Sequence, residues 1–74
     1  MASNDPIDFA LRGDHITLEA LLKAAHLAAF GEARTAIQQG DVTVNGEVDL
    51  RRGRKVRAGD AVVLGAQHVR VIPG

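Results

Sequence analysis

The sequence predicts an α+β domain in which two short N-terminal helices pack on a small, mostly antiparallel β-sheet, with an additional N-terminal strand. Three observations support this prediction. Apolar residues repeat at helical spacing between residues 17 and 38, and they alternate with polar residues between 42 and 50. Asn45-Gly46 interrupts that alternation, and this dipeptide favours a two-residue hairpin turn because both residues tolerate a positive φ.

The first strand and the first helix are expected between residues 7 and 27. In "IDFALR", which starts at residue 7, apolar and polar residues alternate as in a half-buried strand. Thr17 is a typical N-cap, and the helical spacing after it predicts a helix over residues 17–27. We expect Glu19 and Lys23, four residues apart, to form an ion pair on its outer side.

The second helix and the sheet follow. "GEARTAIQQG" predicts a shorter helix that Gly40 terminates. The Asn-Gly hairpin, an "AVVL" strand after the turn "RAGD", and a last strand "HVRVI" predict the sheet. We expect one core made of Leu18, Leu21, Leu22, Ile37, Val42, Val44, Val48, Val62 and Val69.

Length and composition limit the domain count and the class of protein. A chain of 74 residues suffices for one domain with a small core, which we place at residues 7–74 after a disordered tail over residues 1–6. The sequence has no Cys, so disulfides and thiolate zinc sites are excluded. No apolar run approaches the ~20 residues of a membrane span, and the N-terminus does not resemble a signal peptide. A cytoplasmic location is therefore expected.

The net charge of zero conceals a strong separation of charge along the chain. Residues 1–50 carry 3 basic and 8 acidic side chains, and residues 51–74 carry 6 basic and 1 acidic, which gives −5 and +5. Five cations fall within seven positions: Arg51, Arg52, Arg54, Lys55 and Arg57. Guanidinium groups make bidentate hydrogen bonds to phosphate oxygens, so this cluster predicts a surface that binds a polyanion.

A family resemblance is carried by "EARTAIQQGDVTVNGEVDLRRGRKVRAGD", residues 32–60. The second helix, Gly40, the "VTVNG" hairpin and the Gly59-Asp60 turn are similar to the S-four (S4) domain, the RNA-binding domain named after the fourth protein of the small ribosomal subunit. The similarity covers residues 16–64 and is strongest to a bacterial subgroup in which the domain stands alone. It implies non-catalytic binding of structured RNA, ribosomal or transfer RNA, with ribosomes or their precursor particles as partners.

The resemblance and the charge pattern together suggest which residues bind RNA. Many family members carry a Ser-Arg pair where this chain has Ala29 and Phe30, so Arg34 and the basic cluster would carry more of the binding. With only two Phe and no Tyr or Trp, the chain is poorly equipped to stack unpaired bases, which favours structured RNA. The expected RNA-binding residues are Arg34, Arg51, Arg52, Arg54, Lys55 and Arg57, with Lys23, Thr35 and Gln38 as weaker candidates.

No catalytic or metal site is expected. The three His residues fall on different elements, and the acids Asp41, Glu47, Asp49 and Asp60 are expected in turns or facing solvent. We therefore expect a monomer without enzymatic activity, cofactor or small-molecule substrate. Two alternatives remain: an adaptor whose basic segment binds an acidic protein, and a ubiquitin-like sulphur carrier, which is less favoured because the sequence ends "VIPG" where that family needs Gly-Gly.

Overall fold

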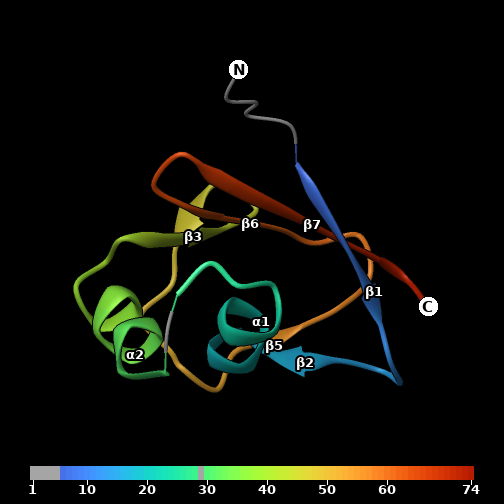
Figure 1. Cartoon of the computed structure of the whole chain (residues 1–74), viewed down its shortest axis with the longest axis horizontal. Helices are drawn as coiled ribbons and strands as arrows, with labels where there is room; N and C mark the ends of the chain where they lie inside the picture. Colours follow the sequence, from blue (N-terminus) through green and yellow to red (C-terminus); the bar gives the residue numbers. More distant parts are fainter. Residues whose placement is uncertain (1–5, 29) are drawn as a thin grey trace.

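The computed structural model describes residues 6–28 and 30–74, so the expected disordered tail lies, except for Pro6, outside the described residues. Two helices cover one face of a five-stranded sheet, and a short two-stranded sheet lies beside the first helix (Figure 1). The elements are β1 (Ile7–Leu11), β2 (Ile16–Thr17), α1 (Leu18–Ala24), α2 (Phe30–Gln38), β3 (Val42–Val44), β4 (Glu47–Val48), β5 (Lys55–Val56), β6 (Ala61–Leu64) and β7 (Gln67–Pro73).

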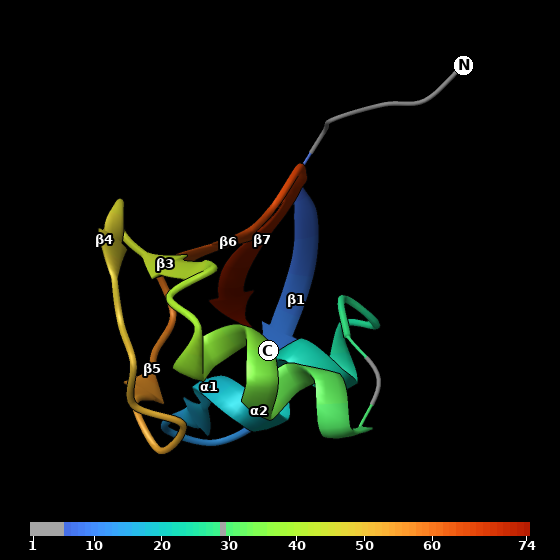
Figure 2. The same ribbon diagram turned by 90° about the vertical axis from the view of Figure 1, so that its left-hand side faces the viewer.

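The strand order of the larger sheet is β1-β7-β6-β3-β4, which places β1 and β4 at opposite edges (Figure 2). Strand β1 pairs in parallel with β7, and the other neighbours pair antiparallel. The predicted α+β arrangement with an added N-terminal strand is therefore confirmed. The sequence did not indicate the second sheet, in which β2 and β5 pair through Ile16–Val56 and Thr17–Lys55.

Helix α1 begins where the sequence predicts and ends earlier. The Thr17 hydroxyl accepts a hydrogen bond from the Ala20 amide at 3.3 Å, which confirms Thr17 as the N-cap. The helix ends at Ala24, and His26 has a φ of +61°, so the predicted extension to residue 27 is wrong. The left-handed residue ends the helix while its last carbonyls still accept hydrogen bonds from the chain beyond.

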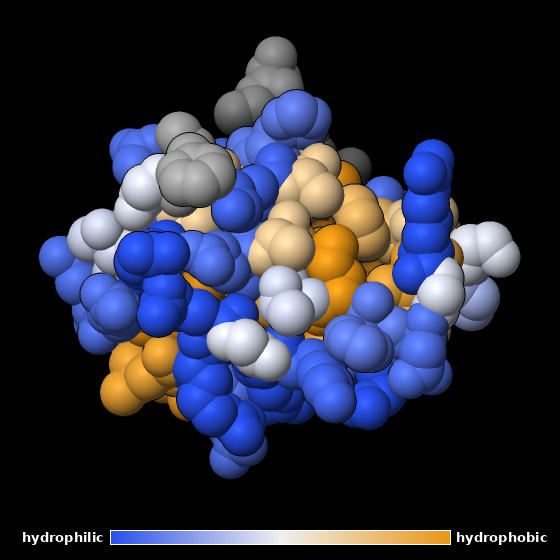
Figure 3. Space-filling view, turned by 90° about the horizontal axis from the view of Figure 1, so that it is seen from below, coloured by the Kyte–Doolittle hydropathy of each residue, from blue (hydrophilic) through white to orange (hydrophobic). Residues whose placement is uncertain are grey.

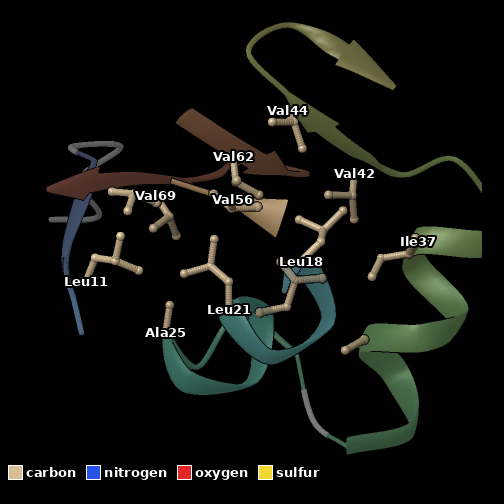
Figure 4. Packing of buried hydrophobic residues seen from close by; sticks show 13 residues of the cluster. Leu11, Leu18, Leu21, Ala25, Ile37, Val42, Val44, Val56, Val62 and Val69 are labelled. Carbon is tan, nitrogen blue, oxygen red and sulfur yellow. The ribbon is translucent and has the colours of Figure 1, made fainter. Parts of the chain in front are cut away.

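One apolar core lies between the sheet and the helices (Figure 4). Eight of the nine core residues expected from the sequence are buried, but Val48 is 58% exposed, so that prediction is wrong. The two-residue turn pairs Val48 with Thr43, and paired residues point to the same face, which here is the outer one. The remaining buried apolar residues are Leu11, Ala25, Ala33, Val56 and Val71.

Side-chain hydrogen bonds join the hairpin turn at Asn45-Gly46 to the turn at Asp60. Asn45 and Gly46 have φ values of +54° and +87°, as the predicted hairpin turn requires. The Asn45 amide nitrogen donates to Asp60 Oδ1 at 3.0 Å, and its oxygen accepts from the Ala61 amide at 2.9 Å. Asp60 Oδ2 accepts from the Arg57 amide at 2.8 Å. The hairpin is thereby tied to the turn that follows the five-cation segment.

Candidate nucleic-acid interface

Residues 50–57, which we call the basic loop, connect β4 to β6 through the short strand β5. The loop runs beside the helices and reaches the start of α1 (Figures 1 and 2). There the Leu18 amide donates to the Arg54 carbonyl at 2.9 Å, and the Glu19 amide donates to the Arg52 carbonyl at 3.1 Å. These carbonyls satisfy amides that the first turn of a helix leaves unpaired, so the loop backbone is held against α1.

The loop is also anchored by apolar packing at one residue. Val56 is fully buried and pairs with Ile16 of β2. Its neighbours Lys55 and Arg57 are exposed. The prediction that Val56 anchors the segment while basic side chains project from it is therefore confirmed for these neighbours.

A buried carboxylate at the start of the loop organises two of the five cations. Asp49 is only 7% exposed, and its Oδ1 accepts from the Arg51 amide at 2.9 Å and from Arg51 Nε at 3.1 Å. Its Oδ2 accepts from Arg51 Nη2 at 3.0 Å and from Arg54 Nη1 at 2.7 Å. The expectation that Asp49 faces solvent is therefore wrong, because it lies on the inner face and the two arginines compensate its burial.

These contacts change the acidity of the groups that take part. The side-chain hydrogen bond from Arg51 is the main cause of a strongly lowered pKa of Asp49, and it outweighs the burial, which acts in the opposite direction. The same pair raises the pKa of Arg51. For Asp60, burial alone would raise the pKa, but the hydrogen bonds from the Arg57 amide and the Asn45 side chain lower it. Asp49 is therefore charged at neutral pH.

The arginines that bind Asp49 differ in how much of their surface stays accessible. The Arg51 side chain is 72% exposed and the Arg54 side chain is 29% exposed. Arg52, Lys55 and Arg57 are exposed, and within residues 6–28 and 30–74 their side chains make no ion pair. The loop thus contains three unpaired cations, one largely exposed arginine held by a carboxylate, and one half-buried arginine.

Arg34 of α2 is brought to the same side of the molecule by Glu19. Arg34 Nε lies 3.4 Å from Glu19 Oε2, and the Glu19 amide is bonded to the loop carbonyl of Arg52. Glu19 therefore connects α2, α1 and the basic loop. Through Glu19, Arg34 is linked to the backbone of the basic loop, and the ion pair with Glu19 engages part of its charge.

The three weaker candidates lie on the two helices. Lys23 lies one turn after Glu19 on α1, and Gln38 lies one turn after Arg34 at the exposed end of α2. The Thr35 hydroxyl donates to the Gly31 carbonyl at 3.1 Å. Thr35 lines a groove that contains the acidic residues Glu32 and Asp41, so the structure does not place it beside the basic loop.

The face of the molecule that carries the helices is largely hydrophilic (Figure 3). Two shallow grooves flank Asp49 and the two arginines that it binds. Arg51 and Arg54 line both grooves. The first, of about 400 Å³, also contains the exposed apolar side chains of Val48 and Leu50. The second, of about 350 Å³, is lined by Arg51, Gly53, Arg54, Lys55 and Arg57. This second groove is open and basic, and an anionic group can enter it.

Sequence reasoning missed Asp49, although the hairpin contained a signal. A two-residue turn at 45 and 46 pairs residue 44 with 47 and 43 with 48. Residue 49 then returns to the face of Val42, and the Asp49 amide donates to the Val42 carbonyl at 3.2 Å. An acid at an inward-facing position needs a cationic partner, and Arg51 and Arg54 follow directly in the sequence.

The described residues give no support for a metal site or for a membrane-spanning helix. The described residues contain no group of three or more His, Asp or Glu side chains placed to hold a metal ion. Neither helix in the described ranges has the length and apolar character needed to cross a membrane.

The model of the family described as "S4 domain" matches residues 9–72, which is almost the whole chain of 74 residues. No curated protein matches the sequence.

Proposed function

Because the chain belongs to the S4 domain family, whose members are generally RNA-binding, we propose that it binds structured RNA through the basic loop and Arg34. The RNA is a ribosomal or transfer RNA, free or within a ribosomal particle, and the protein performs no chemistry on it. The observation that carries this proposal is the basic loop itself, fixed against α1 with three unpaired cations exposed.

The fixed backbone of the loop supports recognition of a folded RNA. Cations at set positions suit phosphates whose spacing is also set, as along an RNA helix or at a junction. Proteins that bind unpaired bases usually stack them on exposed aromatic rings. This chain has only two Phe, and Phe9 is half-buried against the core.

A salt titration of RNA affinity tests the proposal. We expect fluorescence anisotropy to show tighter binding to an RNA hairpin or junction than to a single strand of equal length. With about three to five phosphate contacts at about 0.7 to 0.9 each, log affinity against log salt concentration has a slope of about −2 to −4.5. Binding that is absent at low salt, or insensitive to salt between about 50 and 200 mM, would contradict the proposal.

Substitution of the unpaired cations locates the binding surface. We expect the combined variant Arg52→Ala, Lys55→Ala and Arg57→Ala to lose at least about tenfold in affinity and to melt near the wild-type temperature, because exposed charges contribute little to stability. Arg70→Ala is the control. Arg70 alternates with the buried Val69 and Val71, so it projects from the opposite face of the sheet, and its removal should change affinity less than about twofold.

A second candidate, an adaptor for an acidic protein, is favoured by one observation. Val48 and Leu50 are 58% and 59% exposed beside the basic loop, and apolar side chains next to a basic patch are typical of a protein interface. Purification with and without nuclease distinguishes the two. Nuclease removes the 260-nm absorbance of bound RNA, whereas a protein partner remains bound.

A further inference from the structure

Asp49 accepts hydrogen bonds from one edge of the Arg51 guanidinium and leaves the other edge unused. A guanidinium has five N–H donors in a rigid plane. Arg51 uses Nε and one Nη2 hydrogen on Asp49, so five minus two leaves three donors, two on Nη1 and one on Nη2. One hydrogen on Nη2 and one on Nη1 lie parallel along the outer edge of the plane, which suits two oxygens of one phosphate, and the second Nη1 hydrogen points away from that edge.

The position of Arg51 allows that edge to reach a ligand. Its side chain is 72% exposed although Asp49 holds its inner edge, and it lines both grooves of the basic loop. An exposed arginine without a partner samples many rotamers, and binding must then supply the cost of ordering it. The carboxylate of Asp49 has already fixed Arg51 in the free protein.

We infer that Asp49 is a positioning residue, whose buried carboxylate orients Arg51 so that its outer edge binds one phosphate of the RNA bidentately. This inference rests on the proposed function and adds a division of roles within the basic loop. Arg51 makes a directed phosphate contact. Arg54, held on the same carboxylate and only 29% exposed, supports Asp49 from the inner side. Arg52, Lys55 and Arg57 contribute long-range attraction.

The inference and simple electrostatics predict opposite effects of removing the charge at Asp49. A negative charge beside a phosphate-binding surface repels the ligand, so on charge alone Asp49→Asn raises RNA affinity. If Asp49 positions Arg51, the same change frees the guanidinium and lowers affinity, and we expect a loss of about tenfold at constant salt. Glu47→Gln is the matched control, because Glu47 is an exposed acid two residues away that makes no ion pair within the described ranges.

If Asp49→Asn does not fold, a second pair of variants tests whether Arg51 makes a directed phosphate contact. Arg51→Lys keeps the charge at an exposed position and removes the planar edge. We expect it to lose about fivefold or more in affinity with an unchanged salt slope, since the number of charges is the same. Arg52→Lys makes the same chemical change at an exposed residue without a carboxylate partner in the described ranges, and it should lose clearly less affinity than Arg51→Lys.

The outcomes separate the inference from the proposed function. Circular dichroism at the assay temperature first establishes that each variant is folded. Lower affinity for Asp49→Asn with unchanged or tighter binding by Glu47→Gln, or a larger loss with Arg51→Lys than with Arg52→Lys, supports the inference. Equal or tighter binding by folded Asp49→Asn, or equal affinities of the two lysine variants, overturns it while wild-type binding stands. If the wild type binds no RNA hairpin or junction even at low salt, the proposed function fails.

Discussion

Replacing Asp49 by Asn is expected to destabilise the fold as well as to weaken RNA binding. The side chain is 7% exposed and its two oxygens accept four hydrogen bonds, three from Arg51 and one from Arg54. Asn retains one acceptor, but its amide nitrogen replaces an oxygen and faces arginine donors. Leaving buried polar groups unsatisfied costs about 1 to 3 kcal/mol. The exposure of Arg51 to water places the cost in this range and below that of a fully buried broken pair.

The pH dependence of that loss tests its cause. The folded protein lowers the pKa of Asp49, so the unfolded chain binds a proton first as pH falls. The stabilisation by the charged carboxylate is complete above the unfolded pKa of about 3.9 and is lost as pH falls below it. The free-energy difference between wild type and Asp49→Asn should therefore stay constant from about pH 7 to 5 and shrink below about pH 4.

Urea titrations of both proteins at several pH values measure this difference. The other carboxyl groups are common to both proteins, so their titration largely cancels in the comparison. A loss below about 0.5 kcal/mol at pH 7 would show that Asp49 is not held as the structure indicates. A loss that stays constant down to about pH 2.5 would show that a change in packing, and not the charge, is responsible.

Three further predictions concern stability, each measured by denaturant titration. Leu22→Ala should cost about 2 to 4 kcal/mol because Leu22 is fully buried, whereas Val48→Ala should cost less than about 0.5 kcal/mol at its exposed position; equal losses would contradict the observed register. Asn45→Ala should cost about 1 kcal/mol by releasing Asp60 from the hairpin, and no loss would show that the contact is not formed. Gly46→Ala should cost about 1 to 2 kcal/mol at a φ of +87°, and an unchanged stability would show that the turn does not require this conformation.

The parts of the fold that depend on residues adjacent in the sequence could be predicted. Thr17 precedes the first leucine of α1 and caps it, and Asn45-Gly46 adopts the positive φ values that made it a turn signal. Val48 was misassigned because the alternation was followed along one strand without pairing it across the turn. Applying the register of a two-residue turn would have placed Val48 outside and Asp49 inside.

Contacts between distant segments could not be predicted in the same way. The loop carbonyls of Arg52 and Arg54 accept hydrogen bonds from amides of α1 more than thirty residues earlier, and backbone groups carry no sequence signal. The contact of Glu19 with Arg34 across the helix pair was not predicted either. That contact depends on how α1 and α2 pack, which local spacing does not determine.

The arrangement of acids explains how a chain of zero net charge can present a positive face to a polyanion. Three acids near the basic loop are engaged by their neighbours: Asp49 by Arg51 and Arg54, Asp60 by Asn45 and the Arg57 amide, and Glu19 by Arg34. Five cations against Asp49 and Asp60 leave residues 49–60 at +3. Over the Debye length of about 8 Å at physiological salt, an approaching phosphate is attracted by this local charge and not by the net charge of the molecule. Acids placed within the loop can thus orient its arginines and still leave the loop attractive to RNA.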